Sequence, residues 1–492
     1  MSKLFKDETP AKTAKAKLWI LLVGLCLLLS ACADVPTPVP QPEPSPSPDP
    51  VVQPPPLESR TLTTWTINPN FSESYISNPE TLAWYRRVKL EIAEERKQKC
   101  LPPGTAPEAY PLYPGSATLS ACSGVKHFIG RGLQSDVNAL LTLFRVTGDV
   151  ELLEEVDRLM EIAKERLSDS DGDGYRNWRW LAIYDRSDFN SKEDTLAHGY
   201  IPQIIYVFQR NAEYSTPAHD YRKHADEWLA YLTDEFEAKW ALQSSTAKYE
   251  GLPVKALFHP YIEMLRYTVY MEKLLPNEGK YRRLQQRLAT TVLSEFKTDS
   301  TENGDVFVWS HNVRSERDGG DPDKCLSFQM GSYPNRTIQV FMDLALEGQP
   351  GFADTEVMRK LSRTLSEFIL EPNKFSSLMY KDVGGLRNGS LTPDTRKQTY
   401  IGGWCFEEAS FSSNDPTDRF RTASGYLQFN YAFMAPFAAD DLASLEKTEI
   451  YTVNRRIYGD PTSKTAKVTS INVPAAMAFA RLYHSGGFNL QD

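Results

Sequence analysis

The strongest constraint on the fold is a helical couplet that recurs along the chain. An apolar segment such as "LQSDVNALLTLFRVTGD" is followed within a few residues by a more charged one, "VELLEEVDRLMEIAKERL". Apolar residues recur at spacings of three and four, the periodicity of an amphipathic helix. The couplet starts again near residues 132, 195, 258 and 333, a drifting period of roughly sixty to seventy-five residues. Further helices are expected near 421–438 and 472–485.

This repetition predicts an all-α fold, either an open solenoid or a closed ring of hairpins with an apolar inner and a charged outer helix. The turn within each hairpin is short, whereas the connection to the next hairpin is long. Long connections on one side favour a ring. We therefore expect an (α/α) toroid of repeated helical hairpins with long loops on one face. A hydrophobic content of 41% is enough to bury its core.

The N-terminus predicts export and a lipid anchor. Lysines precede the apolar run "LWILLVGLCLLLSAC", which is too short for a membrane span and is typical of a signal peptide over residues 1–31. Its ending "LSAC" resembles the lipobox of bacterial lipoproteins, in which Cys32 is acylated. The alternative is an ordinary signal peptide that contains a cysteine. Ala33 follows, and by resemblance to the enterobacterial sorting rule it favours the outer membrane.

Residues 32–60 alternate proline with small and acidic residues, so we expect an extended spacer between the anchor and a catalytic domain over 61–492. The protein is thus expected in the bacterial cell envelope, in contact with the membrane only through its lipid. Export to an oxidising compartment predicts disulfides. Three pairings are open, and proximity in the sequence favours Cys100 with Cys122 and Cys325 with Cys405.

An acidic turn, "SDSDGDGYRNWRW", is a candidate calcium site. Asp169, Asp171 and Asp173 match the first, third and fifth positions of an EF-hand loop. Trp180 stands where that loop has its bidentate glutamate, so a regular EF-hand is not expected. Calcium is the one candidate cofactor, and none is required by the chemistry below.

Three loops combine polar residues and glycine with aromatic residues: "DGDGYRNWRW", "ENGDVFVWSH" and "YIGGWCF". In a ring their tryptophans would converge on the opening and offer flat faces to a ligand. The alternative is that each tryptophan fills the space under its own loop. The residues expected to bind substrate are Trp178, Trp180, Arg186, Trp309, Arg317 and Trp404.

Common catalytic signatures are absent from the sequence, including the G-x-S-x-G elbow, the phosphate loop, the dinucleotide fingerprint and the H-E-x-x-H metal helix. A net charge of −9 argues against nucleic acid as a partner. Histidines are the remaining chemistry. His127 and His484 have no supporting neighbours in the sequence, and His219 and His224 fall in a charged outer helix, where a solvated face is expected.

The other three histidines are expected at one mouth of the ring. His198 and His259 open inner helices, and His311 lies in a tryptophan-containing loop. Each is individually more typical of a packed or capping histidine. Elimination from a uronic acid requires a base for the C5 proton, a group that neutralises the carboxylate and an acid for the leaving oxygen. We expect His311, with His198 and His259 in reserve, as the base, and the other roles to fall to Asn312, Arg314 and Tyr261.

Over residues 75–440 the sequence resembles bacterial (α/α)-toroid polysaccharide lyases that act on uronate polymers such as alginate or glucuronan. The hairpin repetition, "EDTLAHGY" at a helix start and the His-Asn pair in a loop carry this resemblance. It implies β-elimination on an anionic polysaccharide. The Asn-Asn-His signature of alginate lyases is not present, and the chain after residue 440 is too short for the β-sandwich that often follows the toroid.

Two alternatives stay open. A glycoside hydrolase on the same ring would use two carboxylates across the mouth. A noncatalytic glycan-binding surface lipoprotein would need only the tryptophans. The candidate carboxylates are Asp185, Asp188, Glu193, Asp194, Glu407 and Glu408.

Overall fold

Helical hairpins form most of the structure, which is 67% helix and 7% strand where it is described. The computed structural model describes residues 65–484 except 103–104, 106–108, 111–114, 171, 181–190, 244–256, 314–324, 328–332, 365–377, 381–397, 402–403, 408–419 and 423–470. The predicted signal peptide, lipidation site and linker to residue 60 lie outside the described residues. So do Arg186, Arg314 and Arg317.

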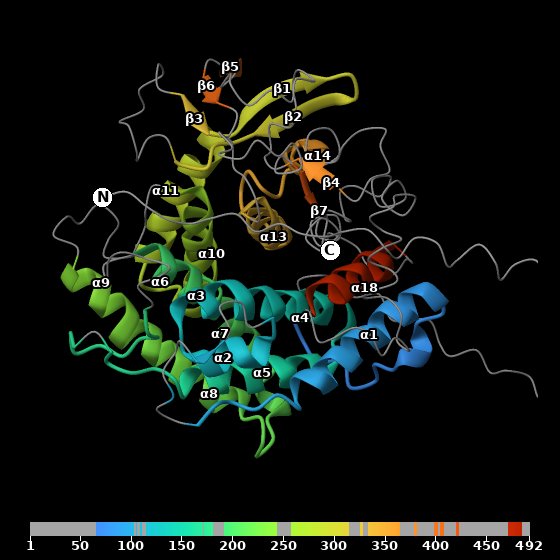
Figure 1. Cartoon of the computed structure of the whole chain (residues 1–492), viewed down its shortest axis with the longest axis vertical. Coiled ribbons are helices and arrows are strands. Elements are labelled where there is room, and N and C mark those ends of the chain that lie inside the picture. The colour runs from blue at the N-terminus through green and yellow to red at the C-terminus, as the bar shows by residue number, and fades with distance from the viewer. Residues whose placement is uncertain are drawn as a thin grey trace, which may run out of the picture. The chain divides into compact units, whose positions relative to one another are not determined.

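The four predicted couplets are confirmed as helical hairpins, and Figure 1 shows them. Each inner helix starts within a few residues of the expected position, although the second is broken into two helices. A further helix, α18 (Asn472–His484), confirms the last one expected. The hairpins are α4 (Gln134–Thr147) with α5 (Val150–Lys164), α7 (Ile201–Arg210) with α8 (Tyr221–Tyr231), α10 (Phe258–Leu274) with α11 (Lys280–Glu295), and α13 (Tyr333–Leu346) with α14 (Thr355–Thr364).

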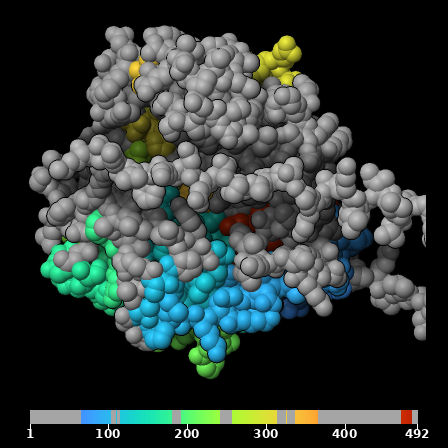
Figure 2. Space-filling view, in the orientation of Figure 1, coloured from blue at the N-terminus to red at the C-terminus, as the bar shows by residue number. Residues whose placement is uncertain are grey.

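Shorter elements connect and extend these hairpins. The chain begins with η1 (Glu73–Tyr75) and α1 (Pro79–Glu95), and α1 packs against α18, which packs against α4. In Figure 2 the N-terminal helices, coloured blue, form a continuous patch of surface. The other short helices are α2 (Ala117–Ser123), α3 (Lys126–Phe128), the π-helix η3 (Ile129–Leu133), α6 (Ser191–His198), η4 (Ala212–Tyr214), the π-helix η5 (Leu232–Glu237) and α9 (Ala238–Gln243).

Local sequence explains the tight turn within the first hairpin. Gly148 ends α4 with a φ of 63°, a conformation that glycine adopts without strain, and its N–H donates to the carbonyl of Phe144 over 2.8 Å. The next residue, Asp149, caps α5 by accepting a hydrogen bond from the N–H of Glu151 over 3.0 Å. Two consecutive residues therefore end one helix and begin the next. By contrast, each long connection leads from an outer helix to the start of the next inner helix, as the sequence predicts.

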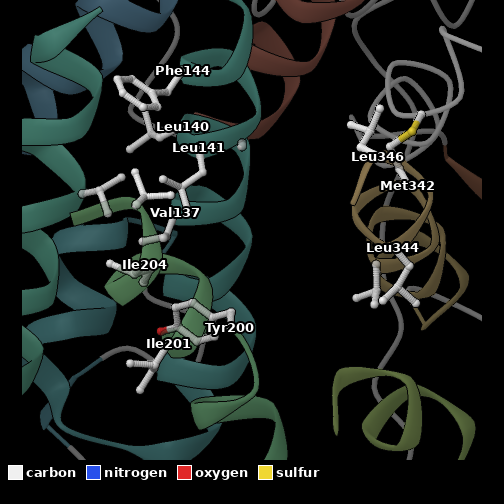
Figure 3. Packing of buried hydrophobic residues seen from close by; sticks show 14 of the residues in the cluster. Val137, Leu140, Leu141, Phe144, Tyr200, Ile201, Ile204, Met342, Leu344 and Leu346 are labelled. Carbon is white, nitrogen blue, oxygen red and sulfur yellow. The ribbon is translucent and has the colours of Figure 1, made fainter. Parts of the chain in front are cut away.

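The inner helices bury their apolar faces against one another. α10 packs against both α7 and α13. Figure 3 shows Val137 of α4 near Ile204 of α7, and both are fully buried. The core is continuous through these helices, which accounts for the all-helical body, while closure into a toroid stays a proposal.

A buried polar network ties the inner helices together. Arg145 of α4 is fully buried and donates to Asp343 over 3.2 Å and to Glu347 over 2.9 Å. Arg266 of α10 donates to the other oxygen of Asp343 over 3.1 Å and to Glu263 over 2.6 Å. Buried charges of this kind are tolerated only when they are paired. The network joins α4 and α10 to the C-terminal half of α13.

Small sheets add to the helices. β1 (Lys297–Thr301) and β2 (Gly304–Val308) form an antiparallel hairpin in register Lys297↔Val308. A three-stranded sheet has the order β3 (Leu326–Ser327), β6 (Trp404–Glu407), β5 (Gln398–Ile401), and β4 (Leu378–Tyr380) pairs with β7 (Phe420–Thr422). Two of the three aromatic loops are therefore β-hairpins. β7 also replaces the start of the helix expected near 421–438, most of which lies outside the described residues.

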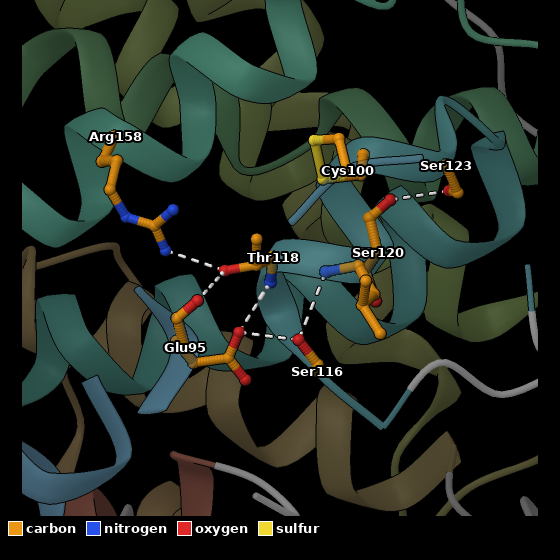
Figure 4. The surroundings of a disulfide bond; sticks show 9 residues. Glu95, Cys100, Ser116, Thr118, Ser120, Ser123 and Arg158 are labelled. Carbon is orange, nitrogen blue, oxygen red and sulfur yellow. Dashed lines mark hydrogen bonds between the residues drawn. A yellow bond between two sulfur atoms is a disulfide. The ribbon is translucent and has the colours of Figure 1, made fainter. Parts of the chain in front are cut away.

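The predicted bond between Cys100 and Cys122 is confirmed, with Cα atoms 5.1 Å apart. Beside it, Figure 4 shows the carboxylate of Glu95 accepting from the hydroxyl of Ser116 over 2.7 Å and from the N–H of Thr118 over 2.8 Å. The disulfide and this cap both hold α2 against the end of α1.

The second predicted disulfide has backbone support. Cys325 is disulfide-bonded. β3 pairs with β6 in parallel, with Leu326 opposite Phe406, so the backbone of Cys405 lies beside that of Cys325. The pairing of these two cysteines stays a prediction. Among the helices described here, none has both the length and the apolar character needed to cross a membrane.

Candidate functional site

Basic and imidazole side chains gather where the inner helices begin. The ring centroids of His259, the second residue of α10, and His311, in the loop after β2, are 5.6 Å apart. Arg131 of η3 pairs with Glu193 of α6 over 2.9 Å, and Arg336 of α13 donates to the carbonyl of Gly130 over 2.9 Å. We call the whole group the basic cluster: His127, Arg131, Lys192, Glu193, His259, His311 and Arg336.

Backbone pairing fixes the two neighbouring imidazoles. Leu257 and Asn312 form an antiparallel bridge, and the N–H of Phe258 donates to the carbonyl of His311 over 3.0 Å. This short ladder attaches the loop after β2 to the start of α10. The predicted pair His259 and His311 is therefore brought together by the structure, with Asn312 next to it in the chain.

Two glycines let η3 approach its neighbours closely. A Cβ atom on Gly130 would lie 2.8 Å from the backbone nitrogen of Ala197, and one on Gly132 would lie 2.5 Å from the hydroxyl of Ser120. At Gly130 only glycine fits without movement of the backbone, whereas at Gly132 the Ser120 side chain would have to turn away. The contact of η3 with α6 places Arg131 against Glu193. A π-helix is rare and is often found at functional sites.

Charge in the basic cluster is mainly positive. Lys192 lies 3.4 Å and His127 3.6 Å from the carboxylate of Glu193. Burial by itself raises the pKa of Glu193, but His127 and Arg131 outweigh burial and hold that pKa well below its usual value. Within the cluster, the carboxylate of Glu193 thus pairs with Arg131 and Lys192, and Arg336 adds a third cation at the neighbouring carbonyl of Gly130.

Burial keeps the imidazoles neutral. His259 is 1% exposed, and burial, followed by His311 and Arg131, holds its pKa well below the ordinary value. Burial also lowers the pKa of His127, although Glu193 acts in the opposite direction. At neutral pH the imidazoles of His259 and His127 are therefore uncharged.

The basic cluster is connected to the central polar network through Glu263. Its carboxylate accepts from the amide of Gln134 over 2.5 Å and from Arg266 over 2.6 Å. Burial raises the pKa of Glu263, while Arg266 and Arg336 lower it. Glu263 is one turn after His259 on α10, so the same face of that helix supplies both groups.

His198 does not join the basic cluster. Its Nδ1 lies 2.7 Å from the carbonyl oxygen of Asp194 and its Nε2 lies 2.9 Å from the hydroxyl of Tyr231. The ring stacks on Phe236 with centroids 4.1 Å apart, and burial lowers its pKa to about 4. His198 is thus the packed histidine that the sequence left open as an alternative. Tyr261, expected as the acid, is 1% exposed and lies about 200° around α10 from His259.

Two of the tryptophans expected to bind substrate are instead core residues. Trp178 is fully buried and its indole N–H donates to the carbonyl of Ala163 over 2.7 Å. Trp309 is fully buried against Phe258 and Phe341. The expectation that these faces are open to ligand is wrong, because each tryptophan fills the space under its own loop. Trp180 is half-buried, and the side chain of Trp404 lies outside the described part of the structure.

The acidic turn uses its carboxylates locally. Asp169 accepts from the N–H groups of Asp173 and Gly174 over 3.1 and 3.2 Å. Asp173 pairs with Lys239 over 2.8 Å, so a cation at this turn would compete with an ammonium group. Asp171 lies outside the described residues, and calcium binding stays a prediction.

Sequence reasoning missed most of the basic cluster. His127 was set aside, and Arg131, Lys192 and Arg336 were not considered. A usable signal existed, because all four residues lie shortly before or within the first turns of helices at the expected mouth. Only the fold shows that His127, Arg131 and Lys192 lie around the carboxylate of Glu193 and that Arg336 reaches the carbonyl of Gly130 beside it.

Among the carboxylates that a hydrolase could use, Asp194 has a structural role and most of the others are not described. Asp194 is fully buried and pairs with Lys126 over 3.0 Å, which is a structural role. Glu407 lies in β6, and its side chain is not described. Asp185, Asp188 and Glu408 lie outside the described residues.

Comparison with protein-family models and with curated proteins finds no match for this chain. The geometry of the basic cluster is therefore the main guide to its function.

Proposed function

We propose that the protein is a polysaccharide lyase that cleaves a uronic-acid-containing polysaccharide by β-elimination at the basic cluster. The observation that carries this proposal is the position of two adjacent imidazoles, His259 and His311, beside an excess of permanent positive charge. The reaction needs a neutral base next to a group that neutralises a carboxylate, and the cluster supplies both.

The proposed chemistry moves one proton and one electron pair. His311, the more exposed of the two imidazoles, removes the C5 proton of the uronate. The electrons form a C4–C5 double bond as the C4–O bond breaks, and the leaving oxygen takes a proton. Because Tyr261 is buried on another side of α10, His311 itself, protonated when it removes the C5 proton, returns that proton to the leaving oxygen. Arg131, Lys192 and Arg336 stabilise the charge that develops on the carboxylate.

The glycoside hydrolase alternative has less support from the described residues. An inverting hydrolase needs one carboxylic acid that is protonated at working pH as well as one carboxylate base. His127 and Arg131 keep the pKa of Glu193 well below its usual value, so this residue suits only the base. Asp194 is held in a buried ion pair with Lys126.

Ultraviolet absorbance tests the proposal, because elimination leaves a double bond conjugated to the carboxylate. Alginate, glucuronan and glycosaminoglycans are the substrates to screen. His311→Ala should lower turnover by about two to four orders of magnitude, the usual contribution of a general base. His484→Ala is the matched control, since His484 ends α18 and lies outside the basic cluster. New reducing ends without absorbance, retained in His311→Ala, would assign the protein to the hydrolases.

A second variant tests recognition of the carboxylate. Lys192→Gln removes a cation whose side chain is partly exposed. This change should lower kcat/KM for a uronate polymer by about 10- to 100-fold. A carboxyl-reduced form of the same polymer should be affected far less. Equal losses on both polymers would contradict a carboxylate-binding role. The anchor at Cys32 would place this activity in the cell envelope.

A further inference from the structure

Two histidines and two carboxylates converge between the outer helices α5 and α8, which lie side by side in Figure 1. Nδ1 of His224 lies 2.7 Å from one oxygen of Asp157, and Nδ1 of His219 lies 2.8 Å from the other. We propose that Asp157, Glu161 and His224 bind a divalent transition metal ion, with Zn²⁺ as the best match to their chemistry. This site is separate from the basic cluster and does not depend on the proposed lyase activity.

The residues are enclosed and aimed at one another. Asp157 is 1% and His224 is 9% exposed, which corrects the expectation that the histidines of this helix form a solvated face. Asp157, Glu161 and His224 each offer a ligand atom, and these atoms lie within 4.8 Å of one another. Asp157 and Glu161 are one helical turn apart, so they share a face of α5. His219 approaches from the segment that precedes α8.

The donor set selects the type of metal. Imidazole nitrogen together with carboxylate oxygen is typical of Zn²⁺ and other late transition ions, whereas Ca²⁺ and Mg²⁺ prefer oxygen alone. An ion held by this set would take one imidazole nitrogen of His224 and one oxygen each of Asp157 and Glu161, and water would complete the coordination.

His219 is placed to support this arrangement. Its Nδ1 lies 2.8 Å from the second oxygen of Asp157. A group that holds a metal-binding carboxylate in this way fixes the orientation of that carboxylate. Lys164 pairs with both Glu161 and Glu227, so this ammonium group is engaged at the edge of the site. His219 is therefore a positioning residue.

A bound ion would connect two hairpins. Asp157 belongs to the outer helix of the first hairpin, and His219 and His224 belong to the second. Ligand binding to the native state alone raises stability as the ligand concentration rises. The melting temperature should consequently rise with added Zn²⁺, and the effect should weaken on acidification because imidazole must be unprotonated to bind metal.

The test is a Zn²⁺ titration of the full chain after treatment with a chelator and its removal, followed by calorimetry. One equivalent should bind, and cobalt substitution should give visible absorption typical of nitrogen and oxygen ligands. Asp157→Asn, Glu161→Gln and His224→Gln should each abolish this equivalent, and His219→Gln should weaken it by about 10- to 100-fold. Asp226→Asn is the matched control, since Asp226 is exposed on α8 two residues after His224, and it should bind like the parent.

His127→Gln separates this site from the basic cluster and should also bind like the parent. Melting curves in chelator show whether each variant folds. If Asp157→Asn does not fold, Glu161→Gln replaces it, because the side chain of Glu161 is 28% exposed and glutamine keeps its size. Failure of the parent protein to bind Zn²⁺, or unchanged binding in a folded ligand variant, overturns the proposal. Because the readout is metal binding, neither result bears on the lyase activity.

Discussion

Replacing Arg145 with methionine would remove the guanidinium that joins α4 to α13 while keeping a side chain of similar length. In the native structure this guanidinium donates to Tyr270, Asp343 and Glu347 over 2.9 to 3.2 Å and is fully buried. It also stacks over the indole of Trp65, 3.9 Å from the ring centroid. The variant would therefore break several interactions at one point of the core.

The size of the destabilisation depends on the ion pairs that Asp343 and Glu347 keep after Arg145 is replaced. Asp343 keeps Arg266 at 3.1 Å, and Glu347 keeps its ion pair with Lys273. Removal of one member of a buried ion pair costs about 3 to 5 kcal/mol, and the surviving cations favour the lower part of this range. Loss of the desolvated cation–π contact adds about 2 kcal/mol, and the apolar methionine offsets part of the total. We expect a net destabilisation of about 3 to 4 kcal/mol.

The assay is urea unfolding of Arg145→Met followed by circular dichroism, with Arg210→Met as control because Arg210 is exposed at the end of α7. The gap between parent and variant should also narrow in acid. Burial raises the pKa of Glu347, but Arg145 and Lys273 outweigh it and hold the pKa low. Stability from that shift is present above the unfolded carboxyl pKa and is lost as the pH falls. A destabilisation below about 1 kcal/mol would refute this description of the core.

Three further predictions concern covalent and titrating groups. Serine at both Cys100 and Cys122 should cost about 2 to 5 kcal/mol of stability, measured by urea unfolding, and an unchanged urea midpoint would show that the bond constrains little. Burial lowers the pKa of His198 to about 4, so stability should be lost as the pH falls from about 6.5 towards 4, because the unfolded imidazole gains a proton first. His198→Gln should make stability depend less on pH in this range. If the urea midpoints of parent and variant fall equally as the pH is lowered, the prediction is wrong. Cys32→Ser should release the protein from membrane fractions, and a variant that still sediments with label from a fatty-acid precursor would show that another group holds it there.

The hairpins could be predicted because helical periodicity is a local property of the sequence. The expected starts at 258 and 333 coincide with Phe258 and Tyr333, the first residues of α10 and α13. The β1–β2 hairpin could not be predicted in the same way. Its first strand, "KTDST", is short and polar, and its alternation of half-buried and exposed residues arises only from pairing with β2.

Residues of the site could be predicted only where their position follows from the start of a predicted helix. His259 fits this condition, and His311 follows because its backbone pairs with the beginning of α10. Arg131 faces Glu193 only because Gly130 lets η3 lie against α6, a contact between segments far apart in the sequence. Trp178 is buried by Trp228 and His198, and no local pattern distinguishes such a residue from a tryptophan that is open to ligand.

The contacts of Trp65 fasten it to the far ends of two inner helices. Its indole N–H donates to Glu347 over 3.0 Å and its carbonyl accepts from Asn211 over 2.8 Å. Both partners follow directly after the last residue of an inner helix, whereas the basic cluster lies where the inner helices begin. A helix of 14 residues such as α4 is about 21 Å long, so Trp65 lies roughly that far from the basic cluster. A substitution of Trp65 would therefore loosen the ends of α7 and α13 while leaving the side chains at the other end of these helices in place.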